Sequence, residues 1–272
     1  MSATPGHPHG PIGLFDSGVG GGTVLRHLRR LLPAEDVLYV ADQAHCPYGN
    51  RPAHEVRRLA TANVQWLLDQ GAKLIVVACN TASAVALRAL RAQFPHVPFV
   101  GMVPPVKPAA LSTRTGVVGV LATPTTLNGE LLQDVIQQWA EGVTVVSREG
   151  HGLVELIEAG HIEGPELEAR LAAFLHPMLA AGADTIVLGC THYPYLRPTI
   201  QRLVGPEVTV LDAGEAVARQ VRRVLRARNM AHPRGSQQGR VLYATTGDPG
   251  HLAHQIARLG LPAGRVITAE LP

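Results

Sequence analysis

Short apolar runs alternate with longer amphipathic segments along most of the chain. The apolar runs are rich in β-branched residues and are bounded by Gly, Pro or Asp, which is typical of buried strands. They lie at 12–15, 37–41, 74–78, 97–101, 116–121, 143–147, 185–188, 208–211 and 240–244. Helices are expected between them, at 22–31, 54–70, 82–93, 128–139, 152–159, 165–181, 213–228 and 250–259. This alternation predicts an α/β protein whose parallel sheets carry helices on both faces, with any ligand at the carboxyl ends of the strands.

Two stretches of the chain share the pattern G-A-x-x-I-V-x-x-C without a gap. One covers residues 71–79 and ends at Cys79, and the other covers 182–190 and ends at Cys190. Upstream, a strand enters a polar turn in each half, and the turn lies 63 residues before the cysteine at Asp16 and 67 residues before it at Thr123. A single strand-end cysteine is usually a small buried hydrophobic residue. A matched pair in a repeat predicts two α/β halves whose thiols face each other across a cleft.

Composition narrows the classes of function. The chain has 272 residues, of which 46% are hydrophobic and 17% charged, so it can build one large or two ordinary domains and is not generally disordered. The formal net charge is +3, and the basic residues form no cluster that would predict a nucleic-acid interface. Only Lys73 and Lys107 are lysines. Neither lies at a strand end near the cysteines, which disfavours a pyridoxal-phosphate Schiff base.

The cysteines and the first residues indicate the compartment. Three cysteines cannot form a disulfide framework, and Cys46, which has no partner in the repeat, is interpreted as an incidental thiol. The polar start of the chain has no signal-peptide pattern, and no metal role is assigned to His7 and His9. The apolar runs are too short to cross a membrane. We therefore expect a soluble cytoplasmic protein.

Two loop motifs each have two interpretations. Residues 16–23, D-S-G-V-G-G-G-T, lack the ending of a P-loop and the last glycine of G-x-G-x-x-G, so a dinucleotide site is disfavoured. Its N–H groups and Ser17 could bind a carboxylate, leaving Asp16 for proton chemistry. Alternatively, it is a plain strand-to-helix turn. Residues 47–49, P-Y-G, form either a simple turn or the roof of a cleft.

His192 follows Cys190 by two residues, and no C-x-x-C or H-x-x-x-H pattern completes a metal site around it. An imidazole near a thiol more plausibly tunes the thiol pKa or moves a proton. Glu155 and Glu158 lie on the apolar segment 152–159. Such carboxylates usually face solvent, and only proximity to His192 would give one of them a role.

Taken together, these motifs resemble the glutamate racemase family of the cofactor-independent aspartate/glutamate racemase superfamily. The resemblance runs from about residue 10 to the end and includes stretches 212–215 and 245–248. Its most specific parts are Cys79-Asn80-Thr81 and Cys190-Thr191-His192, together with 16–18 and 47–49. It implies two flavodoxin-like, three-layer α/β domains related by pseudo-two-fold symmetry. The first comprises 1–98 and 212–272, the second 99–211, and the active site lies in the cleft between them.

The resemblance also implies a chemistry, which is interconversion of L- and D-glutamate without a cofactor or metal, for synthesis of cell-wall peptidoglycan. Inversion at Cα needs acid/base groups on both faces of the substrate. Cys79 would deprotonate D-glutamate with help from Asp16, and Cys190 would deprotonate L-glutamate with help from His192, which Glu158 supports. The residues implied to hold the substrate are Asp16, Ser17, Pro47, Tyr48, Gly49, Asn80, Thr81, Thr126, Thr191 and His192.

The sequence departs from the family pattern in the second half. Residues 123–126 read T-P-T-T where the family has Thr-x-Gly-Thr, Gly129 and Leu132 replace a Ser and a Tyr, and Gly150-His151 replaces a Cys-Pro pair. A sister enzyme acting on aspartate, a hydantoin or an arylmalonate is the alternative, although the paired thiols favour racemisation. A two-lobed amino-acid-binding protein is disfavoured by the same thiols. A homodimer is a further expectation.

Overall fold

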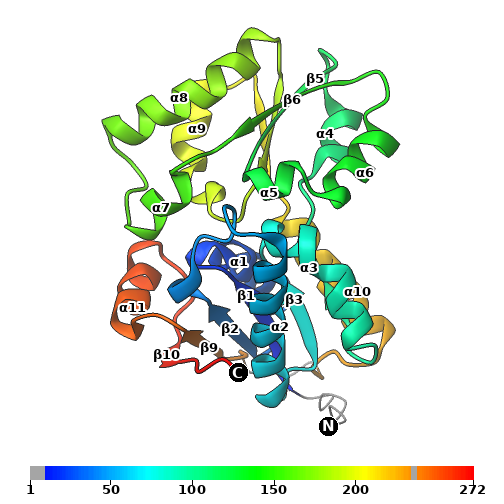
Figure 1. Cartoon of the computed structure of the whole chain (residues 1–272), viewed down its shortest axis with the longest axis vertical. Helices are drawn as coiled ribbons and strands as arrows, with labels where there is room; N and C mark the ends of the chain where they lie inside the picture. The colour runs from blue at the N-terminus through cyan, green and yellow to red at the C-terminus, as the bar shows by residue number, and fades with distance from the viewer. Residues whose placement is uncertain (1–9, 234–237) are drawn as a thin grey trace.

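The computed structural model describes residues 10–233 and 238–272, so His7 and His9 lie outside the described residues. The chain forms two lobes, each built on a sheet with helices on both sides (Figure 1). In both sheets every neighbouring pair of strands is parallel, as the alternating pattern predicts. Within the described residues, no helix has both the length and the apolar content needed to cross a membrane.

The larger sheet has the strand order β10-β9-β2-β1-β3-β4. Its strands are β1 (Ile12–Asp16), β2 (Val37–Ala41), β3 (Leu74–Val77), β4 (Phe99–Val100), β9 (Val241–Thr245) and β10 (Arg265–Thr268). The smaller sheet has the order β6-β5-β7-β8. Its strands are β5 (Val117–Ala122), β6 (Thr144–Glu149), β7 (Thr185–Gly189) and β8 (Thr209–Leu211).

The two sheets repeat one topology. The order β2-β1-β3-β4 corresponds strand by strand to β6-β5-β7-β8, and both follow the flavodoxin-like pattern. The repeat seen in the sequence is therefore a repeat of the fold. It makes β3 and β7 equivalent, so Cys79 and Cys190, which follow these strands, occupy equivalent places at the carboxyl ends of two sheets.

Alternating side chains of each central strand feed two separate cores. In β3, Leu74 and Val76 pack in the core shared with α1 (Gly22–Leu31) and α10 (Gly214–Ala227), whereas Ile75 and Val77 pack in the core of α2 and α3. The latter helices are α2 (Ala53–Asp69) and α3 (Asn80–Gln93), and α11 (Pro249–Arg258) packs beside β9 and β10. Both faces of the strand are thus apolar, which explains its uninterrupted run of hydrophobic residues.

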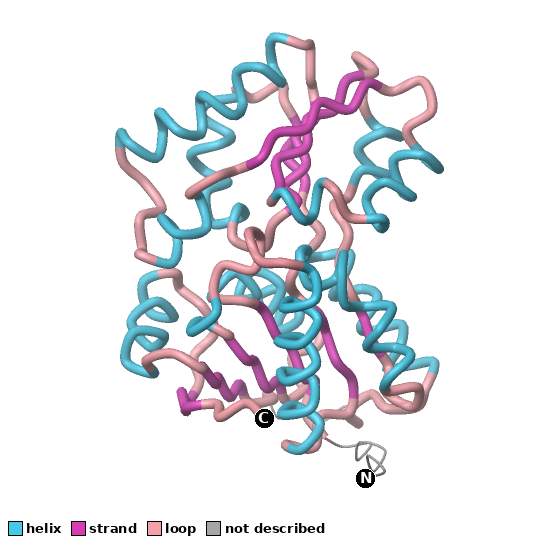
Figure 2. Tube along the Cα trace, viewed as in Figure 1, coloured by secondary structure: helices cyan, strands magenta, loops and turns pink. Residues whose placement is uncertain are grey.

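The smaller sheet is covered in the same way (Figure 2). Helices α4 (Val106–Ser112) and α6 (Glu130–Trp139) share one core with Val187 of β7, and α8 (Pro165–Ala180) and α9 (Arg197–Val204) share the other with Ile186 and Leu188. Short elements complete the lobes: α5 (Pro124–Leu127), α7 (Leu153–Glu158) and the 3-10 turns η1 (Val19–Gly21), η2 (Gln43–His45) and η3 (Tyr193–Leu196).

The predicted strands and helices all exist, with ends displaced by two residues at most. The sequence pattern missed α4, α5, α9 and β10, which are short or partly exposed. Because β4 pairs with β3, we propose the two-domain division with its first boundary after Val100 instead of after residue 98. The second crossing, at residue 212, falls between β8 of the smaller sheet and α10, which packs on α1.

A buried ion pair lies at the amino ends of β2 and β3 in the larger sheet. Lys73 Nζ donates to Glu35 Oε2 at 2.6 Å, and both side chains are at most 3% exposed. Replacing Lys73 by Met should lower the free energy of unfolding by about 3–5 kcal/mol, because it leaves a buried carboxylate without its partner. Urea unfolding measures this loss. The double variant Lys73→Met/Glu35→Leu should recover most of it, and a loss below about 1 kcal/mol in the single variant would contradict the interpretation.

Candidate active site

Cys79 lies where β3 ends and α3 begins. As the N-cap of α3, its Sγ accepts a hydrogen bond from the Ala82 N–H at 3.5 Å. Burial raises the pKa of the Cys79 thiol well above its usual value, and the nearby Asp16 carboxylate raises it further. The Ala82 N–H lowers this pKa but does not compensate for burial. Cys79 therefore carries its proton in this structure.

Cys190 lies at the equivalent end of β7, and His192 follows on the turn into η3. Cys190 Sγ is 3.8 Å from His192 Nδ1, and His192 Nε2 is 2.6 Å from Glu158 Oε1. Burial alone would lower the pKa of His192, but its hydrogen bonds to Cys190, Cys46 and Glu158 outweigh burial and hold this pKa well above its usual value. The structure thus brings together the three predicted residues Cys190, His192 and Glu158.

Glu158 is the ionised partner of this imidazole. Burial would raise the pKa of its carboxyl, but hydrogen bonding and charge from His192, with the Gln43 amide and the Val19 N–H, lower it to about 2. Val19 N donates to Glu158 Oε1 at 2.7 Å. At neutral pH Glu158 and His192 therefore form a carboxylate–imidazolium pair.

Asp16 lies at the end of β1, which is next to β3 in the sheet. Its Oδ2 accepts from Thr191 Oγ1 at 2.8 Å and its Oδ1 from Gly18 N at 2.9 Å. Burial raises its pKa to about 6, although the charge of His192 lowers it in part. The hydrogen bonds of Asp16 thus reach the Cys190 side of the site, while its charge acts on Cys79.

The raised pKa of Asp16 predicts a pH effect on stability. The unfolded chain loses this proton near pH 3.8 and the folded chain near pH 6, so ionisation of Asp16 costs stability as the pH rises between these values. The free energy of unfolding of Asp16→Asn, relative to that of the wild type, should increase by roughly 2.5 kcal/mol between about pH 4 and about pH 7. Urea unfolding at both pH values measures the difference. The exposed Asp134→Asn serves as control, and an equal effect of Asp16→Asn at both pH values would refute the expectation.

One pocket is lined by residues from both lobes, and both cysteines lie on its wall. The lining residues are Ser17, Pro47, Tyr48, Gly49, Cys79, Asn80, Thr81, Thr123, Val154, Cys190, Thr191 and His192. Nearly all of the predicted site residues are in this set. Asp16, Glu158 and Thr126 are not; each is instead hydrogen-bonded to a residue on the wall.

Thr123, and not the predicted Thr126, is among the residues that line the pocket. Thr123 Oγ1 lies 2.9 Å from both Thr81 Oγ1 and Thr126 Oγ1, so Thr126 supports the wall from behind. Thr123 is the N-cap of α5 and follows β5, just as the turn after β1 follows Asp16. The internal repeat had marked this position, whereas the apolar Val154 carried no chemical signal.

Two polar side chains on the wall differ in what they can offer a ligand. The Tyr48 hydroxyl donates to Asp42 Oδ2 at 2.5 Å, so it is already engaged within the protein. Asn80 is 4% exposed, and its Oδ1 has no hydrogen-bond partner among the described residues. Asn80 therefore presents a free acceptor in the pocket.

The glycine-rich turn leaves space for the side chains of His192 and Glu158. A Cβ on Gly18 would lie 2.0 Å from Glu158 Oε1, and one on Gly20 would lie 2.4 Å from His192 Nδ1. Only glycine allows the turn to approach these side chains so closely. The turn does bind a carboxylate through the Val19 N–H, and that carboxylate is Glu158 of the chain itself.

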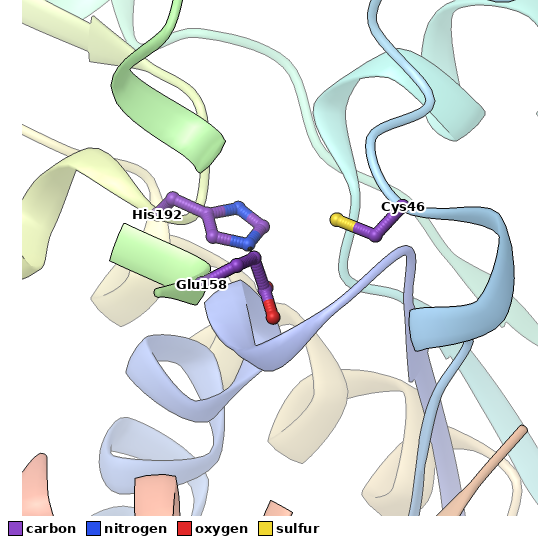
Figure 3. A group of neighbouring side chains, drawn as sticks. All are labelled: Cys46, Glu158 and His192. Carbon is purple, nitrogen blue, oxygen red and sulfur yellow. Dashed lines mark hydrogen bonds and ion pairs between the residues drawn. The ribbon is translucent and has the colours of Figure 1, made fainter. Parts of the chain in front are cut away.

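Cys46, which the repeat pattern had indicated to be an incidental thiol, lies beside His192 and Glu158 (Figure 3). The three residues bring one donor atom each within 4.8 Å of one another, a set that could hold a soft divalent metal. The imidazole and carboxylate already bind each other, however, and burial raises the pKa of the Cys46 thiol to about 11. The described contacts therefore fit a hydrogen-bonded group of protein side chains better than a metal site.

Comparisons with known proteins identify the family of the chain. A model of the Asp/Glu/hydantoin racemase family matches residues 20–221. The chain is 57% identical over 261 residues to a glutamate racemase of Roseiflexus sp. (strain RS-1), which covers 96% of both chains.

Solved structures are similar over almost the whole chain. The glutamate racemase of Thermus thermophilus, in complex with beta-chloro-D-alanine, has a TM-score of 0.82 and 37% identity, covering 97% of this chain and 98% of that one. The Escherichia coli glutamate racemase, in complex with L-glutamate and the activator UDP-MurNAc-Ala, has a TM-score of 0.83 and 31% identity, covering 97% and 99%. This chain therefore belongs to the Asp/Glu/hydantoin racemase family, within its glutamate racemases.

Proposed function

We propose that the protein interconverts L- and D-glutamate by moving the Cα proton between two thiols, and so supplies D-glutamate for peptidoglycan. The observation that carries this proposal is the placement of Cys79 and Cys190 at the ends of the equivalent strands β3 and β7, on the wall of one pocket. Inversion at Cα needs one group to take a proton and another to deliver one to the opposite face. The repeat supplies such a pair.

The two thiols have different surroundings, which suggests how a cycle runs. When L-glutamate reacts, Cys190 in its thiolate form takes the Cα proton, and Cys79 delivers its own proton to the other face and becomes the thiolate. His192, 3.8 Å from Cys190 Sγ, can exchange a proton with that sulfur. When D-glutamate reacts, the roles are reversed: Cys190 starts protonated and delivers its proton, and Cys79 must start ionised, against the effect of burial. The positive ammonium group of the bound substrate favours that ionisation.

The pocket wall suits an amino acid with two carboxylates. Among the described residues, no arginine or lysine lines it, so neutral donors would bind the carboxylates. Hydroxyl side chains from both lobes lie on the wall: Ser17, Thr81, Thr123 and Thr191. Thr191 and Thr123 donate to Asp16 and Thr126 in this structure, so these two hydroxyls must rotate to donate to a substrate carboxylate. The free Oδ1 of Asn80 is an acceptor for the substrate ammonium group. The L-glutamate bound by the Escherichia coli relative supports this choice of substrate.

Chirality measurements test the substrate. The purified protein, free of added cofactor and metal, is incubated with L-glutamate and, separately, with L-aspartate, and the enantiomers are resolved by chiral chromatography. We expect glutamate to reach equal amounts of both enantiomers and aspartate to stay essentially unchanged. Racemisation of aspartate with glutamate left intact would assign the site to the sister activity.

The homodimer and the cytoplasmic location stay predictions, and light scattering measures the oligomeric state.

A further inference from the structure

The carboxylate of Glu158 is held across the cleft by two glutamine side chains that no sequence motif had marked. Gln43 Nε2 donates to Glu158 Oε2 at 3.0 Å, and Gln255 Nε2 donates to the same oxygen at 3.2 Å. Gln255 Nε2 also donates to the backbone oxygen of Glu158 at 2.6 Å. Because Glu158 Oε1 receives Val19 N–H and His192 Nε2, both carboxylate oxygens are fully engaged.

The two glutamines fix each other. Gln43 Nε2 donates to Gln255 Oε1 at 2.7 Å, and Gln43 Oε1 accepts from Thr245 Oγ1 at 3.0 Å. Thr245 and Gln255 are 0% and 2% exposed. Every amide hydrogen and oxygen of this pair therefore has a defined partner. Thr245, in the 245–248 stretch, thus sets the orientation of the Gln43 amide.

The donors and the acceptor belong to different lobes. Gln43 lies on η2 after β2 and Gln255 on α11, both beside the larger sheet, whereas Glu158 lies on α7 beside the smaller one (Figure 1). Glu158 in turn holds His192 at 2.6 Å, and His192 lies 3.8 Å from Cys190 Sγ. One lobe thus orients, through Glu158, the imidazole that serves the thiol of the other lobe.

We propose that Gln43 and Gln255 are positioning residues that clamp Glu158 from the opposite lobe, so that Glu158 keeps His192 aligned with Cys190. The proposal rests on the proposed racemase function for its kinetic part alone. Hydrogen bonds to a charged group such as the Glu158 carboxylate contribute more free energy than hydrogen bonds between neutral groups. A misaligned proton-transfer group lowers the rate of the chemical step more than it lowers substrate binding.

The test replaces Gln255 by Met, which keeps the length of the side chain and removes its amide. We expect kcat to fall about 10- to 100-fold with KM changed less than about threefold. Gln43→Met should also lower kcat, but by a smaller factor. It serves as the second variant if Gln255→Met does not fold. Gln201→Met is the matched control, since Gln201 lies in α9, away from the site, and its amide donates to the backbone oxygens of Gly205 and Val208, which follow that helix.

Two further readouts separate positioning from a general structural defect. In the Glu158→Gln background, Gln255→Met should have little additional effect on kcat, since both changes act through one carboxylate. The His192 ring signals in ¹H–¹⁵N NMR spectra, assigned by their loss in His192→Asn, should shift in Gln255→Met and stay in place in Gln201→Met. The NMR measurement requires no activity, so it tests whether Gln255 positions His192 through Glu158 even if glutamate is not the substrate. Unmoved ring signals, an unchanged kcat, or effects that multiply with Glu158→Gln would each overturn the proposal.

Discussion

Replacing Cys190 by serine is expected to lower kcat/KM for glutamate racemisation by about 10³-fold, and replacing Cys79 by serine is expected to do the same. A hydroxyl is a far weaker acid than a thiol, so each variant lacks an acid/base group on one face of the substrate. Because the equilibrium constant between enantiomers is one, kcat/KM must fall equally in both directions. Polarimetry from each pure enantiomer measures these losses.

The two variants should fail in mirror-image ways. Cys190→Ser retains Cys79, so it should still exchange the Cα proton of D-glutamate for deuterium without inversion, and Cys79→Ser should do so with L-glutamate. Serine fills nearly the same volume as cysteine, and thermal unfolding should therefore stay close to the wild type. A single-cysteine variant that racemises within about tenfold of the wild type would rule out the two-thiol mechanism.

His192→Asn is expected to lower kcat about 10²-fold with a smaller effect on KM. The imidazole is the group that can exchange a proton with Cys190, and Asn keeps a polar side chain of similar reach without that capacity. Because its partners hold the pKa of His192 well above its usual value, the wild-type imidazole stays protonated through neutral pH. Wild-type activity should then show no inflection from His192 near pH 6.5, the ordinary value.

Steady-state kinetics from about pH 5.5 to about pH 8.5 check this expectation, because an ordinary histidine titrates within this range. Glu158→Gln is the companion variant, because it removes the negative charge of one of the three partners, after Cys190 and Cys46, that raise the pKa of His192, while leaving the imidazole in place. It should introduce an inflection that moves toward the ordinary pKa of histidine. If His192→Asn kept kcat within about twofold of the wild type, His192 would have no part in proton transfer.

Local patterns predicted the fold well because its central strands are apolar on both faces. Val37–Ala41 and Leu74–Val77 could be placed from their runs of β-branched and aliphatic residues. The repeat around Cys79 and Cys190 added the topology, since equal patterns at strand ends place two thiols at equivalent edges. Short elements such as β10 lack such a run and depend on pairing with a neighbour.

Contacts between the lobes could not be predicted in the same way. Gln43 is separated from Glu158 by 115 residues, and no local pattern marks this contact between the lobes. The contact of Glu158 with His192 lies within one lobe, 34 residues apart, and it was implied only by the family resemblance. Cys46 was interpreted as incidental because the repeat gives it no partner, yet the fold puts it beside His192. Gly18 and Gly20 carried a signal, a glycine-rich turn, but the groups that approach them come from the other lobe.

Isotope partition during the first turnovers tests the two-thiol mechanism most directly. Wild-type protein is incubated with L-glutamate in D₂O, and both enantiomers are isolated after a small fraction of conversion. With two thiols, the D-glutamate formed should carry deuterium at Cα, because Cys79 delivers a solvent-exchanged proton, while the remaining L-glutamate keeps its protium. Retention of protium in the D-glutamate product would show that one base carries the same proton from face to face, and it would rule out the two-thiol mechanism.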